Sequence, residues 1–140
     1  MPFHETSIRV RFHEVDSYGV VWHGSYTVYL EAARLAISED FGLSLDEMKK
    51  MGVYSPVIEM KIRYRSFLRY GDEMTVKTSV VPTEKASLTF KYIIERKSDS
   101  TRIAEAETTH VLLTLEGKLL YQPPEPFKER LIKMMEAFGS

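Results

Sequence analysis

Alternating apolar and polar residues near the start of the chain predict a half-buried β-strand. Over residues 8–13 the strand would bury Ile8, Val10 and Phe12 and expose the arginines and the histidine between them. This period of two is typical of a strand with one face on a core. A loop that contains Asp16 and Gly19 follows.

At about Gly24 the period changes to that of an amphipathic helix. Apolar side chains then recur at helical spacing: Tyr26, Tyr29, Leu30, Ala33, Ile37 and Phe41. Polar residues mark the opposite side: Thr27, Glu31, Arg34 and Ser38. Gly42 fits a C-terminal stop. The pattern predicts one long helix that has small side chains on its flank and is largely surrounded by other elements of the fold.

A short helix and a series of strands are predicted after Gly42. Ser44 and Glu47 have the spacing of a capping box, and the short helix would close at Gly52. Strands are predicted over residues 58–64, 74–80, 87–95, 102–115 and 118–121, and a final amphipathic helix over residues 127–138.

This order of elements indicates one α+β domain over residues 1–140, in which a single antiparallel sheet is covered by the long helix. An antiparallel sheet curled around a central helix is the hotdog fold. The pattern alone is equally compatible with other α+β layouts.

Composition narrows the possible functions. A chain of 140 residues that is 44% hydrophobic supports one core. The 19 basic and 20 acidic residues leave no excess charge for nucleic acid or an anionic membrane surface. There is no cysteine, which excludes disulfides, thiolate nucleophiles and cysteine-bearing zinc sites. The beginning of the chain lacks the apolar run of a signal peptide or membrane span, so we expect a cytoplasmic location.

The sequence predicts no metal and no cofactor. The four histidines, at positions 4, 13, 23 and 110, do not have ligand spacing with a carboxylate. Glycine-rich nucleotide-binding motifs are also absent.

The loop before the long helix contains a carboxylate that is suited to acyl-group chemistry. Asp16 lies seven residues before His23, where the helix is predicted to start. Free N–H groups and the dipole at a helix N-terminus stabilise the oxyanion that forms when a thioester carbonyl is attacked. Asp16 could attack that carbonyl or deprotonate a water molecule. Taken alone, an Asp in such a loop is better explained as an acceptor of backbone N–H groups of the loop, and the residues around it are needed to favour catalysis.

Several unlike residues stand at fixed offsets around this loop: Glu14-x-Asp16, Gly19-Val20-Val21, Trp22-His23, Tyr26 and Glu31-Ala32-Ala33-Arg34. They resemble the 4-hydroxybenzoyl-CoA thioesterase family, and within it the YbgC-type acyl-CoA thioesterases. A weaker likeness covers Ile62 to Asp72, and the whole resemblance spans roughly residues 7–122. Tyr18, Ser25 and Phe67 depart from the family pattern, which bears on substrate choice more than on the reaction.

The resemblance implies a hotdog-fold acyl-CoA thioesterase with Asp16 as nucleophile or general base. It also implies that the backbone N–H of His23 is an oxyanion donor, and that its side chain orients water or protonates the departing sulfur. A homodimer with paired sheets, or a homotetramer, would then place the active site between subunits. We expect Glu14 to pair with Arg11 or Arg34.

Substrate contacts are predicted on both motifs. Tyr18 and Trp22 would line the acyl pocket. The phosphates of CoA require cations or backbone donors near the mouth of the pocket. The candidates are Arg63, Arg65 and Ser66, followed by Arg69, Lys85, Arg96 and Lys97.

Three alternatives remain open at this stage. A hotdog dehydratase and an acyl-carrier-protein thioesterase are the enzymatic ones, and a non-catalytic acyl-CoA-binding protein is the third. No partner other than the acyl-CoA substrate and further copies of the chain is predicted.

Overall fold

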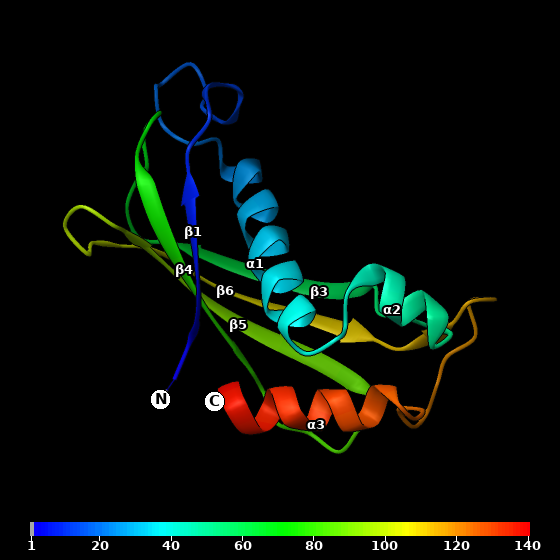
Figure 1. Ribbon diagram of the computed structural model, residues 1–140. Coiled ribbons are helices and arrows are strands. Elements are labelled where there is room, and N and C mark those ends of the chain that lie inside the picture. Colours follow the sequence, from blue (N-terminus) through cyan, green and yellow to red (C-terminus); the bar gives the residue numbers. More distant parts are fainter. Residues whose placement is uncertain (1) are drawn as a thin grey trace.

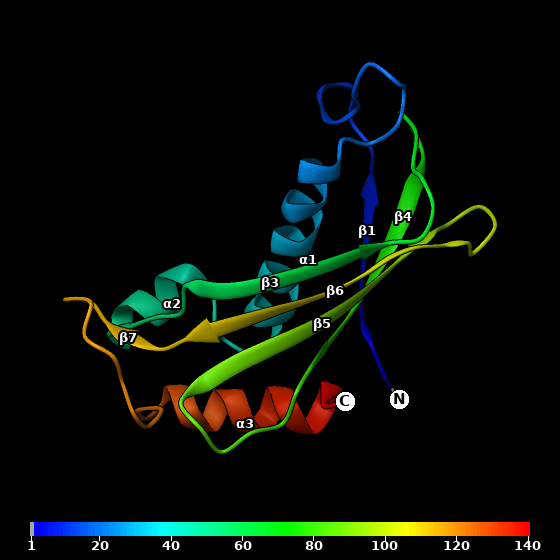
Figure 2. The same ribbon diagram turned by 180° about the vertical axis from the view of Figure 1, so that it is seen from behind.

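A computed structural model describes residues 2–140, and a five-stranded antiparallel sheet wrapped around a long helix is its main feature. The sheet has the order β1-β4-β5-β6-β3. Its strands are β1 His4–Arg9, β3 Val57–Tyr64, β4 Glu73–Val80, β5 Ser87–Arg96 and β6 Arg102–Val111. The helices are α1 Tyr26–Asp40, α2 Leu45–Lys50 and α3 Phe127–Phe138. Figures 1 and 2 show α1 across one face of the sheet, which confirms the hotdog expectation.

Helix α1 forms the centre of the core. Tyr29, Ala33 and Ile37 are fully buried on its inner stripe, at the spacing that the sequence predicted. They face the alternating inner side chains of the strands, such as Met74 and Val76 of β4. The apolar stripe of the helix and the apolar face of the sheet therefore pack together as one core layer.

The start of the sheet differs from the sequence prediction. Strand β1 runs from His4 to Arg9 and pairs with β4, whose first residue, Glu73, is opposite Arg9. The ladder ends where β4 begins, so the chain turns into a short 3-10 turn, η1 Phe12–Glu14. Phe12 is 75% exposed there, and its prediction as a buried strand residue was wrong.

The predicted strand over 102–115 is divided in two. Strand β6 ends at Val111, and β7 Leu113–Thr114 pairs instead with β2 Val53–Tyr54 in a separate two-stranded sheet. The predicted strand over 118–121 is reduced to a single bridge between Leu113 and Leu119, which follows the tight turn at Gly117.

Strand β3 is an open edge of the sheet. It pairs with β6 on one side and has no neighbour on the other among residues 2–140. Its apolar side chains are exposed at this edge, including Val57, Ile58, Met60 and Tyr64. Only Ile62 is partly buried. The sequence predicted an alternating strand here, but its apolar face is not covered within one chain.

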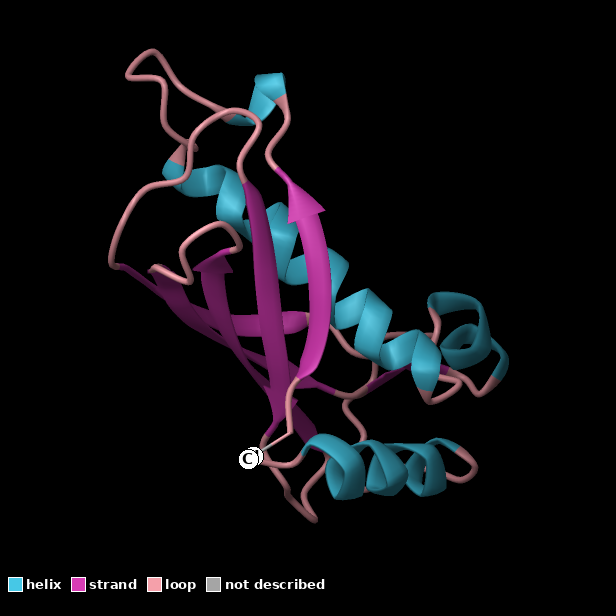
Figure 3. Ribbon diagram, turned by 60° about the vertical axis from the view of Figure 1, so that its left-hand side comes forward, coloured by secondary structure: helices cyan, strands magenta, loops and turns pink. Residues whose placement is uncertain are grey.

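The terminal helix α3 closes the end of the sheet away from the Asp16 loop (Figure 3). Phe127, Leu131 and Met134 are buried on its inner stripe, as the sequence predicted. Arg130 joins it to the neighbouring α2 segment by donating to the Gly42 carbonyl at 2.8 Å and to Glu47 at 3.0 Å.

Candidate active site

The Asp16 loop is a short, closed hairpin. Val15 and Val21 form an antiparallel bridge across its base, and the Asp16 N–H donates to the Val20 carbonyl at 2.9 Å. Gly19 closes the turn with its N–H on the Asp16 carbonyl and a φ of +80°, a conformation that glycine adopts without strain. The carboxylate therefore projects from a defined turn.

One carboxylate oxygen of Asp16 is engaged and the other is free. Oδ1 accepts the Tyr18 N–H at 2.8 Å, which fixes the rotamer of the side chain. Oδ2 has no hydrogen-bond partner within residues 2–140, and the residue is partly exposed. The loop-capping role and a free nucleophilic or basic oxygen thus coexist on the same group.

The second motif lies directly against this loop. The Val21 N–H donates to the Leu68 carbonyl at 2.8 Å, and Val20 forms a bridge with Arg69. The segments at 16–21 and 66–72, which are far apart in the sequence, are thereby side by side at one end of the sheet (Figure 1).

A 3-10 turn, η2 His23–Ser25, precedes α1 and holds the candidate oxyanion donors. The N–H groups of His23 and Gly24 have no acceptor within residues 2–140. The Tyr64 hydroxyl of β3 donates to the His23 carbonyl at 2.7 Å. Because a peptide group is planar, this contact also orients the Gly24 N–H, which points the opposite way.

Trp22 packs on the helix start. A Cβ added at Gly24 would lie 2.3 Å from the indole ring, so only glycine leaves room for the ring in this position. The indole is 50% exposed, and its centroid is 5.0 Å from that of the His23 imidazole. Trp22 is thus a wall beside the free N–H groups, and its role in lining an acyl pocket stays a prediction.

Two tyrosines beneath the helix start are held in the neutral form. Burial raises the pKa of Tyr26 to about 12. Burial, and then the hydrogen bond to Glu14, raises the pKa of Tyr29 as well. Neither phenol is therefore available as a base at neutral pH.

The other predicted contact residues are distributed unevenly. Tyr18 is 85% exposed at the tip of the turn. Arg65 pairs with Glu105 at 3.1 Å, and the Ser66 N–H donates to the Ile103 carbonyl. Arg63 is exposed on β3 and forms no ion pair within residues 2–140. Arg65 and Ser66 therefore lie just after the end of β3, whereas Arg63 lies on β3 itself.

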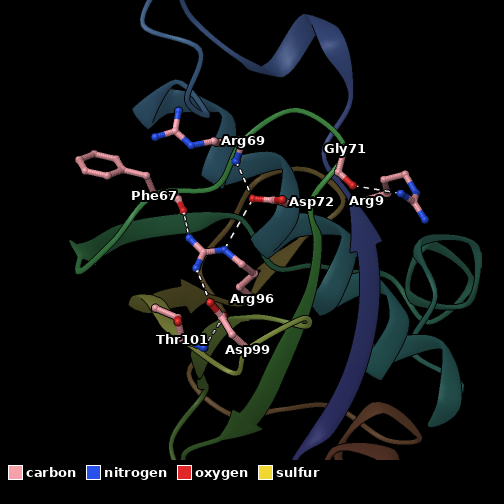
Figure 4. A network of polar contacts seen from close by, with 8 residues as sticks. All are labelled: Arg9, Phe67, Arg69, Gly71, Asp72, Arg96, Asp99 and Thr101. Carbon is pink, nitrogen blue, oxygen red and sulfur yellow. Dashed lines mark hydrogen bonds and ion pairs between the residues drawn. The ribbon is translucent and has the colours of Figure 1, made fainter.

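The Arg96 side chain is engaged in contacts within the protein and is not free to bind a substrate phosphate. Its guanidinium donates to the Phe67 carbonyl and to Asp99, and it lies 3.6 Å from Asp72 (Figure 4). Asp72 in turn accepts the Arg69 N–H at 2.9 Å. The Arg69 guanidinium takes no part in this network and forms no ion pair within residues 2–140. Arg69 is the cation beside the Asp16 loop that remains free.

A cavity of about 880 Å³ runs beside α1. It begins at Thr27, whose hydroxyl donates to the Gly24 carbonyl at 2.8 Å, and it reaches Met134 of α3. Buried apolar side chains such as Leu30 and Phe90 form its wall, and Met60 of the open β3 edge lies at its border. The predicted polar stripe of α1 lines this cavity.

Three residues of this site were missed or only partly identified from the sequence. Tyr64 was not singled out, Gly24 was named only as a possible start of the long helix, and Glu14 was named only within the family motif and as an ion-pair partner. It pairs with Arg11, as expected, whereas Arg34 approaches Glu31. Glycine immediately after an aromatic-His pair is the sequence signal that could have indicated the packing of Trp22 on Gly24.

The comparison with known protein families decides the identity of this arrangement. The model of the thioesterase-like superfamily matches residues 10–131, which include the hairpin, η2 and the sheet strands β3 to β6. The chain belongs to the thioesterase-like superfamily. This membership confirms the resemblance seen in the Asp16 segment.

Individual relatives of the chain carry thioesterase names, which agrees with membership of this superfamily. A putative acyl-CoA thioesterase, YneP of Bacillus subtilis, is 32% identical over 110 residues, 79% of each chain. The acyl-CoA thioester hydrolase YbgC of Escherichia coli O6:H1 is 28% identical over 100 residues, which are 71% of this chain and 74% of YbgC. The crystal structure of DHNA-CoA thioesterase from Staphylococcus aureus superposes with a TM-score of 0.87 at 26% identity, covering 97% of this chain and 93% of that one.

Within residues 2–140, no helix has the length and apolar character needed to cross a membrane. In the same part of the chain, no group of three or more His, Asp or Glu side chains is placed to hold a metal ion.

Proposed function

We propose that this protein hydrolyses acyl-CoA thioesters, with Asp16 as the reacting carboxylate. The observation that carries the proposal is that a closed hairpin with a free Asp16 oxygen is joined, through the Glu14 carbonyl and the Trp22 N–H, to a helix start with unbonded N–H groups at His23 and Gly24. Membership of the thioesterase-like superfamily and the names of YneP and YbgC support a CoA ester as substrate.

The reaction follows from these groups. The thioester carbonyl oxygen accepts the His23 and Gly24 N–H groups, so the negative charge that develops on it meets preorganised donors and the helix dipole. Asp16 either attacks the carbonyl carbon, giving an anhydride that water then opens, or removes a proton from the attacking water. In either route the C–S bond breaks when the tetrahedral intermediate collapses, so in the first route the CoA thiolate has left before water opens the anhydride. The thiolate is then protonated, and we assign that proton transfer to the His23 imidazole.

The second motif is the proposed place for the phosphates of CoA. Arg69 has an unengaged guanidinium beside the Asp16 loop, and guanidinium groups bind phosphate oxygens in a bidentate manner. Arg63, Arg65 and Ser66 remain candidates along the same strand and turn. Arg65 would have to exchange its contact with Glu105 for a phosphate.

The cavity beside α1 is the proposed acyl site. It starts one helical turn after Gly24. The polar stripe of α1 borders it, but buried side chains such as Leu30 and Phe90 are apolar, so an acyl group extending from the carbonyl would lie against them. Tyr18 and Trp22 would border its entrance.

A second copy of the chain would complete the site. The open β3 edge has unpaired backbone groups and exposed apolar side chains, which favours pairing with another strand. A two-fold pairing of β3 with β3 of a partner would also close the cavity at Met60. We therefore expect a homodimer, or a homotetramer built from it, acting in the cytoplasm.

A thiol-release assay on the wild type and Asp16→Asn tests the function. The substrates are acetyl-CoA, decanoyl-CoA and benzoyl-CoA, together with the same acyl groups on an acyl carrier protein. We expect hydrolysis of at least one CoA ester by the wild type and a loss of at least about 100-fold in kcat for the variant. Equal rates for the two proteins would contradict the role of Asp16.

The alternatives give different results. A dehydratase would retain hydration of an enoyl thioester in Asp16→Asn and lose it in His23→Ala. A non-catalytic protein would change the fluorescence of Trp22, which is the single tryptophan, when acyl-CoA binds, yet release no thiol. A preference for carrier-protein esters would show as a higher kcat/KM on those substrates.

A further inference from the structure

Glu14 is the one carboxylate within residues 2–140 that is buried, with 3% of its surface exposed. Its Oε1 accepts the Tyr29 hydroxyl of α1 at 2.9 Å and the Arg11 N–H at 2.8 Å. Its Oε2 accepts Arg11 Nε at 3.1 Å. The side chain therefore connects the segment before the Asp16 hairpin to Tyr29, near the start of the long helix.

The backbone of the same residue makes a second connection. The Glu14 carbonyl accepts the Trp22 N–H at 2.9 Å and the Ser25 hydroxyl at 3.0 Å. Trp22 and Ser25 lie on either side of the candidate oxyanion donors. Both ends of one residue thus join the hairpin to the helix start.

The chemistry of this position requires an ionised carboxylate. Burial opposes ionisation, but the Arg11 N–H, the Tyr29 hydroxyl and the Arg11 guanidinium together hold the pKa of Glu14 below its ordinary value. Arg11 and Tyr29 present only donors to it, and the His13 Nε2 lies 3.8 Å from Oε2, so an acceptor-only side chain suits the position. A glutamine would set its NH₂ group against a donor at one of these contacts.

We propose that Glu14 is a positioning residue, which fixes Asp16 relative to the N–H groups of His23 and Gly24. The inference rests on the proposed hydrolase function and deepens it. Asp16 follows Glu14 by two residues, and its hairpin has no other side-chain hydrogen bond to α1 within residues 2–140. A displacement of about 1 Å between reacting groups costs about 100-fold in rate, so this link controls kcat.

The role is tested with Glu14→Gln and Tyr29→Phe. Tyr29→Phe removes one hydroxyl and leaves the pairing of Glu14 with Arg11 in place. We expect kcat to fall about tenfold or more in Glu14→Gln and about threefold to tenfold in Tyr29→Phe, with KM within about threefold of the wild type. Because the two residues act through one contact, the double variant should be hardly slower than Glu14→Gln.

A purely structural role would lower the melting temperature without this split between kcat and KM. The matched control is Glu47→Gln, which weakens the contact of α2 with Arg130 far from the hairpin. This control should lose stability but keep kcat. If Glu14→Gln does not fold, Tyr29→Phe decides the question. A kcat within twofold of the wild type in Tyr29→Phe, or in a folded Glu14→Gln, would overturn the proposal.

A second readout separates this proposal from the function itself. Acrylamide quenching of Trp22, the single tryptophan, should increase in both variants, because loss of the contact between Glu14 and Tyr29 lets the Glu14 segment shift, and its carbonyl is the acceptor of the Trp22 N–H. If the wild type hydrolyses no thioester, the proposed function fails while increased quenching would still support the link. If the wild type is active but quenching and kcat are unchanged in the variants, the positioning role fails alone.

Discussion

Replacement of Gly24 by alanine should displace Trp22 from the helix start. The new Cβ would lie 2.3 and 2.4 Å from two indole carbons, whereas ordinary contacts begin at 3.4 Å. The ring has to retreat by about 1 Å or rotate outward, because atoms in close contact cannot interpenetrate. It is already 50% exposed, so outward rotation is open to it.

The cost follows from the area involved. An indole side chain buries about 150–250 Å² when enclosed, so the covered half of Trp22 corresponds to about 100 Å², or about 2.5 kcal/mol. Alanine regains about 0.5–1 kcal/mol over glycine in a helical turn. We therefore expect Gly24→Ala to lose about 1–2 kcal/mol of unfolding free energy, with a melting temperature lower by roughly 5 °C.

The assay uses the indole itself. Emission of Trp22 should shift to longer wavelength in Gly24→Ala, and KM for the acyl-CoA should rise because the wall beside the carbonyl site is displaced. In a Trp22→Leu background the same alanine should be neutral or stabilising, since the ring that it displaces is absent. Unchanged emission together with an unchanged melting temperature would refute the packing of Trp22 on Gly24.

Two other contacts lead to measurable effects. Tyr64→Phe removes the hydroxyl that orients the His23 peptide, so kcat should fall about threefold to tenfold at constant KM. This loss is smaller than the roughly 100-fold or more expected when an oxyanion donor is removed. Kinetics that match the wild type would exclude this role. Burial, partly offset by the Ser55 carbonyl, holds the pKa of His110 below its ordinary value, so the unfolded chain takes up the proton first as the pH falls below about 6.5. Stability should therefore decline from about pH 7.5 to about pH 5.5 in urea titrations, and His110→Gln should show a smaller decline; equal slopes would contradict the assignment.

The secondary structure was largely determined by local sequence patterns. The apolar stripe of α1 was read from helical spacing and is buried as predicted. The strand at 8–13 was misplaced because alternation specifies a face but not where a partner strand ends. Phe12 continues the alternating pattern, yet β4 has no residue left to pair with it.

The candidate site was only partly accessible from the sequence. Asp16 and His23 lie close together along the chain, within a motif with fixed offsets. The Tyr64 contact with His23 spans 41 residues, and the Glu14 contact with Tyr29 spans 15. Such partners are brought together by strand pairing and helix packing, so no local spacing indicates them.

The amino-acid order alone determined which segments are helical, which alternate as strands, and which carboxylate precedes a helix start, because those properties depend on neighbours in the chain. Tertiary structure decided which edge of the sheet stays open, where Phe12 lies and what holds the Asp16 hairpin to α1. These outcomes depend on contacts between residues far apart in sequence, and their geometry is set only when the sheet closes around the helix.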